Sequence, residues 1–565
     1  MKKFLSKKIV FIIFYIIILL MNLAIPNSIN FHNVLAKERY DSAIENGTVP
    51  EITISQMIDN KSKVDEFDNF LKNSRLLLIL VSSVFFIMFL IINTENISIS
   101  KIFLFISIPI GLLYVFIIPI GGIPDESAHW YKSYEVSLGH FISDKNAENY
   151  GGRVLPKVIR SVLTDDDEIG ARPVEERSIK MSYKEWKDKY NKAISEDNGE
   201  EEFIEFSNTS LYSAVCYFPQ ALGIAVSRIF TSSLLVQSYF ARIFNFITYV
   251  IIMWYAIKKL PLKKVALFVI SFLPITFQEA ASLSIDGIQM AFATLLISYT
   301  VYLTFDESTQ KLKLKDYIIL LISSIFTAIT KFVYLPICLI IYILPKEKFK
   351  SVKIKYIILT TIFIIAVVLD LSLMLKSMNY NNRIALPNAD IVGQLKFIYH
   401  NPIKFIDVIC LTIQDYGMEH TFELFGQHMS WLDVNISTVY IVSLFIITMY
   451  LLYFQNTNDE KNVLKNEDSK EDRLRKIITK IFMIIIVCGT AFGIAFTEYL
   501  TITPVGHQFI IGTQGRYYLP ILMLFGIAFS NNLKKEKNTI KIEYLAMFMV
   551  FANLNALINI MFRYL

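Results

Sequence analysis

Long, uninterrupted apolar runs recur along the whole chain. The run Ile102–Ile120, for example, contains no charged side chain. A helix of about 20 such residues spans the roughly 30 Å hydrocarbon core of a bilayer, and we count about a dozen runs of this kind. The pattern therefore predicts an all-α polytopic membrane protein, with a bundle of about 11–13 transmembrane helices.

Short lysine-rich loops between the runs predict the topology. Loops such as Lys258-Lys259 and Lys311–Lys315 are expected on the cytoplasmic side, because cytoplasmic loops carry an excess of Lys and Arg. This rule places residues 121–239 outside the cell. The predicted spans after the first are Leu76–Ile92, Ile102–Ile120, Phe240–Tyr255, Val265–Ala281, Ile288–Thr304, Tyr317–Thr330, Phe332–Leu344, Ile354–Leu375, Thr438–Phe454, Ile477–Ala495, Tyr517–Phe529 and Ile542–Ile560.

Two runs allow more than one interpretation. Ile9–Ile25 is either a first span or part of a signal peptide cleaved after Val34-Leu35-Ala36, and both alternatives leave Pro26–Ser74 outside. Leu211–Phe230 has the length of a span, but counting it would place every later lysine loop outside. We therefore expect a helix lying in the outer interface; the alternative is a true span paired with a further unseen one.

The polar segment Lys132–Asn208 predicts a small folded domain in the first outer loop, and it includes the acidic run Asp165–Glu168. Three regions follow from this organisation. Residues 1–101 hold the N-terminal membrane segments, residues 102–530 the membrane core with its outer loop 121–239, and residues 531–565 a cytoplasmic loop and the last transmembrane helix.

Composition agrees with a membrane protein. Of 565 residues, 54% are hydrophobic and only 19% are charged, which is less charge than a soluble protein carries. The net charge of +5 comes from lysines in the expected cytoplasmic loops, so it does not indicate nucleic-acid binding. We expect a multi-pass protein of the cell membrane, in contact with membrane lipids.

The sequence IPDESAHW directly follows the run Ile102–Ile120. It holds Asp125, Glu126, His129 and Trp130. Ionisable groups near hydrocarbon cost several kcal/mol, so they are candidates for function by default. The alternative is that Asp125 and Glu126 are only a helix cap and a solvated charge.

Further polar groups fall on the same predicted outer face. Asp286 lies between two spans, and Lys331 at the top of a hairpin. Asp286 could equally form a turn that caps the next helix, and Lys331 could extend its amine from a helix end to the interface. Other polar residues occupy the two later outer loops: Glu419, His420, Glu423, His428, Asp433, His507, Gln508 and Gln514. Glu419, His420 and His428 show no metal-ligand spacing that we recognise and are expected to be polar loop residues.

Arg516 opens an apolar span and is the strongest candidate for binding an anion. Its planar guanidinium is always charged and suits bidentate phosphate binding. Gly512 and Gly515 would let a ligand approach the backbone, and Tyr517 follows directly. Together with a carboxylate that can accept a proton, such a cation favours group transfer from a lipid-linked phosphate.

Several stretches resemble a known family. IPDESAHWYKSYEVSLG, FLPITFQEAASLSIDG, LFGQHMSWLD and IIGTQGRYYLP occur here in the order seen in a DUF2142-like family of bacterial predicted membrane proteins of unknown function, placed with the GT-C glycosyltransferases. The resemblance extends from about Ile102 to Pro520. The His129-Trp130 pair departs from many relatives.

The resemblance implies a GT-C-like bundle with its site on the outer face and a polyprenyl-phosphate-linked sugar as donor. It implies that Asp125 is the base or a metal ligand, and that Arg516 holds the donor phosphate. We expect Glu126 to assist Asp125, and a divalent cation, Mg²⁺ or Mn²⁺, to bind these two carboxylates if any metal is used. The expected substrate-binding residues are Arg516, Gln514, His129, Trp130, Lys331, Asp286 and Tyr517.

The expected activity is therefore transfer of a sugar to a cell-envelope glycan or lipid acceptor. Two alternatives stay open. One is a transporter or flippase of lipid-linked sugars, which would favour broken helices and charges at mid-depth. The other is a non-catalytic envelope assembly protein that binds through the loop Lys132–Asn208.

Overall fold

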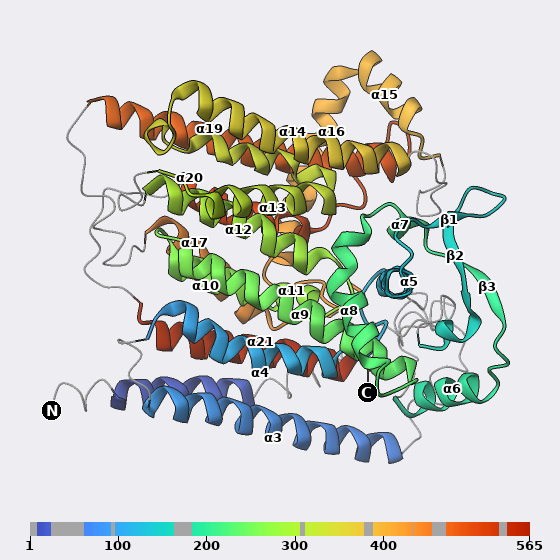
Figure 1. The fold of residues 1–565 in the computed structure, drawn as a ribbon. Coiled ribbons are helices and arrows are strands. Elements are labelled where there is room, and N and C mark those ends of the chain that lie inside the picture. The colour runs from blue at the N-terminus through green and yellow to red at the C-terminus, as the bar shows by residue number, and fades with distance from the viewer. Residues whose placement is uncertain are drawn as a thin grey trace. The chain divides into compact units, whose positions relative to one another are not determined.

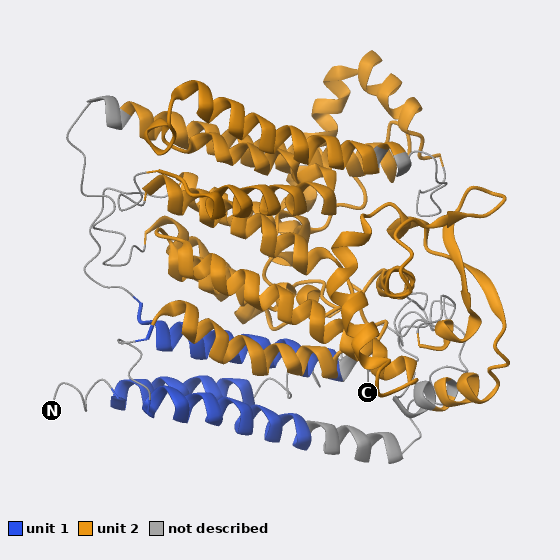
Figure 2. Ribbon diagram, in the orientation of Figure 1, with its two compact units in different colours: residues 1–97, 540–563, 565 blue, residues 98–539, 564 orange. Residues whose placement is uncertain are grey.

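The computed structural model describes residues 8–23, 61–91, 97–162, 183–305, 311–377, 388–432, 434–454, 470–529 and 540–564. The helices and strands are labelled in Figure 1. The chain forms two compact units, one of residues 1–97, 540–563 and 565, the other of residues 98–539 and 564 (Figure 2). The sequence motifs named above all lie in the second unit.

The predicted fold class is confirmed. Among the described residues, 7 helices are long and apolar enough to cross a membrane, so the chain is an all-α polytopic membrane protein. Their apolar cores are Lys72–Ile91, Ile99–Ile117, Leu234–Lys259, Asp286–Phe305, Val352–Leu373, Leu474–Thr501 and Ile542–Met561. Shorter apolar helices lie at Lys8–Leu23, Ala214–Ser227, Phe332–Ile343, Thr438–Tyr453 and Gly515–Phe529. The total of about 11–13 spans stays a prediction.

Among its described residues, the first unit contains three helices: Lys8–Leu23, α3 (Lys61–Ile91) and α21 (Ile542–Tyr564). Tyr15 stacks on Phe86 with ring centroids 4.0 Å apart, and its hydroxyl lies 2.9 Å from Ser83 Oγ. Aromatic and hydroxyl contacts thus hold the unit together. The expected cleavage site Val34-Leu35-Ala36 lies outside the described residues.

The second unit is built on a series of helices that pack side by side. α9 (Leu234–Lys259) contacts both α4 (Ile99–Ile117) and α12 (Asp286–Phe305). α12 in turn contacts α13 (Leu314–Thr330), which contacts α14 (Val352–Ser377). Figure 1 shows these helices as a layer of nearly parallel rods.

A second group of helices closes this unit. α19 (Lys470–Thr501) packs against the 3-10 helix η5 (Phe332–Ile343) and against α20 (Leu519–Phe529). α20 also contacts α17 (Thr438–Tyr453). Two short 3-10 segments complete the connections: η6 (Lys346–Lys348) and η7 (Gly515–Tyr518).

The predicted span Val265–Ala281 is not one helix. It is divided into α10 (Lys264–Ser271) and α11 (Pro274–Ala280), with Pro274 in the first turn of α11. Proline has no backbone N–H group. In the first turn of a helix this group would have no partner within the helix, so proline is tolerated there. Side chains satisfy carbonyls freed by the break: Tyr249 donates to Ser271 O at 2.9 Å, and Thr276 to Ile270 O at 3.3 Å. Such substitutes are what make a break tolerable inside lipid.

The segment Leu211–Phe230 contains no long helix. It forms the 3-10 turn η4 (Ala214–Tyr217) and α8 (Phe218–Ser227), which has 10 residues. At 1.5 Å per residue α8 is about 15 Å long, half a bilayer core. Phe218 and Leu222 are exposed on one side, while Gln220 and Ile224 are buried on the other. α8 alone is therefore too short to cross a bilayer core, and its position in the outer interface stays a prediction.

We call the polar segment after α4, which is folded within the second unit, the small domain. It contains α5 (Glu126–Ser137), a 3-stranded antiparallel sheet, the turn η2 (Lys157–Ser161) and the helices α6 (Tyr183–Ser195) and α7 (Ser207–Ser210). The strands are β1 (Asp144–Lys145), β2 (Gly151–Pro156) and β3 (Glu201–Glu205), in the order β1-β2-β3. The acidic run Asp165–Glu168 lies outside the described residues.

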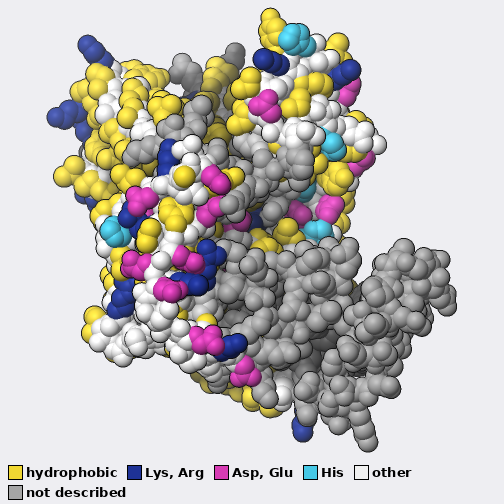
Figure 3. Space-filling view, turned by 90° about the vertical axis from the view of Figure 1, so that its right-hand side faces the viewer, with side chains coloured by type: hydrophobic (Ala, Val, Ile, Leu, Met, Phe, Trp, Pro, Cys, Tyr) yellow, Lys and Arg dark blue, Asp and Glu magenta, His cyan; other side chains and the backbone are white. Residues whose placement is uncertain are grey.

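Paired charges occur both inside this domain and on its surface. Arg160 contacts Glu202 at 2.6 Å, and the buried Glu135 accepts from Lys132 and Arg153, each at 2.7 Å. Figure 3 shows acidic and basic side chains interspersed over the described part of this face. The domain surface is therefore a mixture of both signs where the structure describes it.

The region before Thr438, where the sequence predicts an outer loop, is largely helical. α15 (Ile391–His400) and α16 (Pro402–Glu423) occupy it. Asp390 caps α15 by accepting from the amides of Val392 and Gly393. α16 buries Phe405, Val408 and Thr412 on one side, which is the helical period that hydropathy alone did not detect. Asp433 lies outside the described residues.

Candidate functional site

Asp125 stands at the start of α5 in a left-handed conformation, with φ 62°. Its side chain does not cap the helix; instead Oδ1 accepts a hydrogen bond from Asn208 Nδ2 at 3.0 Å. Asp125 is exposed. Asp125 therefore occupies the N-cap position of α5 without making the capping hydrogen bond. Its carboxylate remains accessible.

Glu126 has a different environment. Its side chain is only 1% exposed, and both oxygens accept hydrogen bonds from within the protein. Oε1 accepts from Arg242 Nε and from Leu283 N, and Oε2 accepts from Arg242 Nη2 and from Gly121 N. Glu126 is therefore not a solvated charge, and its contacts orient the start of α5.

Arg242, which sequence reasoning missed, is the centre of this arrangement. It also donates to the carbonyls of Val115, Ile118 and Pro119 at the end of α4. With the two bonds to Glu126, all five N–H donors of the guanidinium are used. An arginine inside an apolar run was the available signal, because such a charge must be paired.

His129 is buried next to Asp125 and is uncharged at neutral pH. Nδ1 lies 2.8 Å from the Tyr217 hydroxyl. Burial lowers the pKa of His129 to about 4, although the nearby Asp125 and Asp286 carboxylates oppose this shift. Trp130, in contrast, is fully buried and donates to Ile159 O at 3.2 Å, so it belongs to the core of the small domain.

A second ion pair joins Asp286 and Lys331. Lys331 Nζ lies 2.7 Å from Asp286 Oδ1 and 4.7 Å from the centre of the Tyr517 ring. Asp286 does begin α12 after a turn, since its amide bonds to Ser284 Oγ. Its carboxylate nevertheless pairs with Lys331 across the fold, so Lys331 is paired within the protein.

A third pair joins Arg516 to Glu279, another residue that sequence reasoning missed. Arg516 Nη1 lies 2.6 Å from Glu279 Oε1, and the Glu279 side chain is 1% exposed. Three buried polar atoms here have no hydrogen-bond partner among the described residues: Arg516 Nε, Glu279 Oε2 and Gln514 Oε1. Buried unpaired groups are rare and costly, so this pair has capacity for a ligand.

These pairs form one cluster. The charges of Asp125, Asp286 and Lys331 all act on the His129 imidazole, and those of Lys331 and Arg516 act on Asp286. His129 therefore lies within electrostatic reach of Asp125, Asp286 and Lys331, and Asp286 lies within reach of Lys331 and Arg516. We call the set Asp125, His129, Glu279, Asp286, Lys331, Arg516 and Tyr517 the polar cluster.

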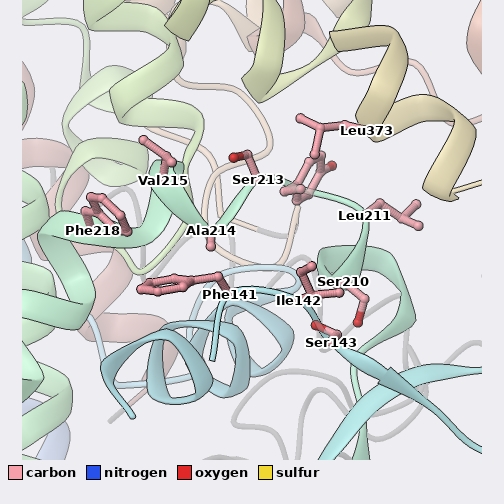
Figure 4. Close-up of a pocket in the computed structure, with 11 residues that line it drawn as sticks. Phe141, Ile142, Ser143, Ser210, Leu211, Ser213, Ala214, Val215, Phe218 and Leu373 are labelled. Atoms are coloured by element: carbon pink, nitrogen blue, oxygen red, sulfur yellow. The ribbon is translucent and has the colours of Figure 1, made fainter. Parts of the chain in front are cut away.

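A groove of about 340 Å³ has Tyr212 in its lining, and the Tyr212 ring stacks on His129 of the polar cluster with centroids 6.4 Å apart. Figure 4 shows Phe141, Val215, Phe218 and Leu373 around it. The Tyr212 hydroxyl lies within electrostatic reach of Lys331 and Asp286. An apolar groove thus ends beside charged groups, which is the usual composition of a ligand site.

The loop after α16 connects the cluster to the first loop. Ser430 N donates to Gln278 Oε1 at 2.7 Å, and Ser430 Oγ to Gly122 O at 2.8 Å. Trp431 Nε1 donates to Gly121 O at 2.6 Å. The turn at Gly121-Gly122 is therefore held from one side by this loop and from the other by Glu126.

Comparison with known proteins identifies one family. The family of predicted membrane proteins DUF2142 matches residues 108–525, from within α4 to within α20. The match includes every residue of the polar cluster and the sheet domain. No curated protein and no solved structure matches this chain. The chain therefore belongs to the DUF2142 family of predicted membrane proteins.

Proposed function

We propose that this protein is a membrane glycosyltransferase of the GT-C type. It transfers a sugar from a polyprenyl-phosphate donor to a cell-envelope glycan or lipid acceptor, with the polar cluster facing the outside of the cell. The observation that carries the proposal is the convergence of an accessible carboxylate, Asp125, with two cations, Lys331 and Arg516, in one cluster beside an apolar groove.

Asp125 is the general base. Its carboxylate accepts the proton of the acceptor hydroxyl while that oxygen attacks the anomeric carbon of the donor sugar. The bond between this carbon and the phosphate oxygen breaks, and the polyprenyl phosphate leaves with the electron pair. Asn208, which donates to Asp125 Oδ1, holds one carboxylate oxygen and leaves the other for the acceptor.

Lys331 and Arg516 stabilise the charge that develops on the departing phosphate. Both are already held in place by carboxylates, Lys331 by Asp286 and Arg516 by Glu279, so they need little reorganisation in the reaction. The unpaired Nε of Arg516 is available to a phosphate oxygen. Tyr517, against the Lys331 amine, and Gln514 complete the donor side.

The groove accepts the first part of the prenyl chain. Its lining is mainly apolar, and Phe218 and Phe141 are 47% and 58% exposed. A volume of about 340 Å³ is at the lower end for small-molecule sites, so it suits one end of a long chain whose remainder stays in lipid. Glu126 and Trp130 serve as positioning residues, because their contacts are internal.

The test is transfer of radiolabelled sugar from a polyprenyl-phosphate donor by the purified protein in lipid. Asp125→Asn keeps the size of the side chain and removes the base, so transfer should fall by 100-fold or more, on the order expected for losing a general base. Asp415→Asn on the exposed side of α16 is the matched control and should retain full activity. Wild-type rates in Asp125→Asn would overturn the mechanism.

One observation favours a second candidate, a flippase for the same lipid-linked sugars. The break between α10 and α11 lies just before Glu279, and broken helices next to charged groups are typical of transporters. Vesicles containing the protein and labelled donor distinguish the two. Transbilayer movement of intact donor without a new glycosidic bond would favour the flippase; a new bond favours the transferase.

A further inference from the structure

Three potential metal ligands lie together at the end of α16 and in the loop that follows. Glu419 and Glu423 are four residues apart on the helix, so their side chains share one face. His428 returns to that face from the loop, with its backbone in the left-handed region at φ 58°. One ligand atom from each residue lies within 4.8 Å of the other two.

Each ring nitrogen of His428 faces one of the two glutamates, at a distance longer than a strong hydrogen bond. His428 Nε2 lies 3.6 Å from Glu419 Oε1, and His428 Nδ1 lies 3.4 Å from Glu423 Oε1. One ion can bind only one of these nitrogens, so the candidate site consists of a single ring nitrogen and one oxygen from each glutamate, all within 4.8 Å of one another. Hydrogen bonds between such groups would be about 2.7–3.0 Å.

Surrounding contacts orient these ligands, and one of them, from Gln427 Nε2, reaches His428 Nε2 at 3.2 Å. Glu423 Oε2 accepts from the Gly515 amide and lies 3.2 Å from His420 Nδ1, so Oε1 is the oxygen left for an ion. The His428 amide donates to Asn435 Oδ1 at 2.8 Å, which fixes the left-handed turn. Outer contacts of this kind orient first ligands in metal sites and strengthen binding.

We propose that Glu419, Glu423 and His428 bind one divalent transition-metal ion, with Zn²⁺ the preferred metal. One imidazole and two carboxylates suit Zn²⁺ better than Mg²⁺ or Ca²⁺, which prefer oxygen ligands only. Three protein ligands leave a fourth position open for water or substrate, and the side chains of Glu419 and His428 are 40% and 27% exposed. The site goes beyond the proposed transfer reaction and does not depend on it.

This site differs from the metal site expected at Asp125 and Glu126. Both Glu126 oxygens accept from Arg242 and from backbone amides, so that carboxylate has little capacity left for an ion. Glu423, in contrast, bonds to the amide of the residue just before Arg516. A bound ion therefore lies next to the polar cluster without replacing any of its ion pairs.

Zinc binding by tag-free, chelator-treated protein in detergent tests the proposal. Isothermal titration with ZnCl₂, with metal content measured after dialysis, should give one equivalent for the wild type. His428→Ala and Glu419→Gln should each weaken binding by more than about tenfold. His400→Ala is the matched control, because His400 is exposed on α15 and bonds only locally to Lys396 O; it should bind as the wild type does.

Three results would overturn the proposal: no equivalent bound by the wild type, equal affinity in Glu419→Gln, or preference for Mn²⁺ over Zn²⁺, which reverses the usual order of affinities. Glu419→Gln keeps the test valid if His428→Ala does not fold, since Glu419 is the most exposed of the three side chains. If the ligand variants lose zinc binding but keep sugar transfer, the zinc site is still supported. If the wild type binds zinc but transfers no sugar, the zinc site is supported and only the proposed transfer reaction fails.

Discussion

The Arg242 guanidinium donates two parallel hydrogen bonds to the Glu126 carboxylate, Nε to Oε1 at 2.8 Å and Nη2 to Oε2 at 2.6 Å, across 116 residues of sequence. The pair joins the first half of α9 to the first residue of α5. Because both side chains are 1% exposed or less, the pair is shielded from water, and it determines where Asp125, the adjacent residue, is placed.

Glu126→Gln should therefore lower stability strongly. Breaking one partner of a buried ion pair costs about 3–5 kcal/mol, because the other charge stays buried. The measurement is the thermal unfolding midpoint in detergent. Glu200→Gln is the control, since its pair with Lys157 spans 3.7 Å and both side chains are about 60% exposed; it should change stability by less than about 1 kcal/mol. Equal midpoints for the two variants would contradict the structural role of Glu126.

The Asp286–Lys331 pair should show coupling in a double-mutant cycle. Lys331→Met leaves Asp286 without its cation, and Asp286→Asn leaves Lys331 without its anion. The double variant removes both charges, so its loss of stability should be smaller than the sum of the single losses by roughly 0.5–3 kcal/mol. Chemical unfolding of the four proteins measures this difference, and strict additivity would show that the 2.7 Å contact has no energetic role.

Stability should fall with acid in a window set by His129. Burial lowers its folded pKa from 6.5 to about 4, so between these values the unfolded chain binds more protons than the folded one. Stability from this group is present above pH 6.5, falls as the pH drops toward 4, and changes no further below that. The full loss is roughly 3 kcal/mol.

His129→Gln removes the titrating group while keeping a polar side chain. The unfolding midpoint of this variant, followed from pH 7 to pH 4, should decline less steeply than that of the wild type. Asp125, Glu126, Asp286 and Lys331 act on the same imidazole, so the comparison is made with these residues unchanged. Parallel curves for the two proteins would rule out His129 as the source of the decline.

Gly515→Ala should disturb the loop that carries Arg516. A Cβ at this position would overlap His420 O and the Glu423 side chain, whose Oε2 accepts from the Gly515 amide. Both the unfolding midpoint and the transfer rate should fall. Gly489→Ala on α19 meets no atom within 4 Å and should be neutral or stabilising by up to about 1 kcal/mol. Similar behaviour of the two variants would mean that the loop adapts freely.

The sequence predicted the membrane helices well where burial in lipid decides the structure. Ile102–Ile120 and Ile288–Thr304 correspond to α4 and α12, because a long apolar run needs no knowledge of its neighbours. Val265–Ala281 was not predicted correctly, since summed hydropathy does not show where a helix is interrupted, although Pro274 was a signal. α15 and α16 were missed because their apolar residues recur with a helical period rather than in one block.

For the candidate site, too, the sequence predicted some residues and missed others. Asp125, Asp286, Lys331 and Arg516 stood out as charges beside apolar runs. Their partners did not: Glu279 lies 237 residues from Arg516, and nothing local in the sequence connects them. The ligands of the proposed metal site had one local signal, the four-residue spacing of Glu419 and Glu423, and His428 joins them only through a left-handed turn.

The backbone at Asp125 also limits how this position can be probed. At φ 62° an ordinary L-residue pays about 1–2 kcal/mol, whereas Asn and Gly adopt this conformation readily. Asn therefore isolates the lost charge, while Ala would combine it with backbone strain. A conventional alanine scan would thus overstate the contribution of the Asp125 carboxylate. A library selected only for folding should be enriched at this position in Asp, Asn and Gly.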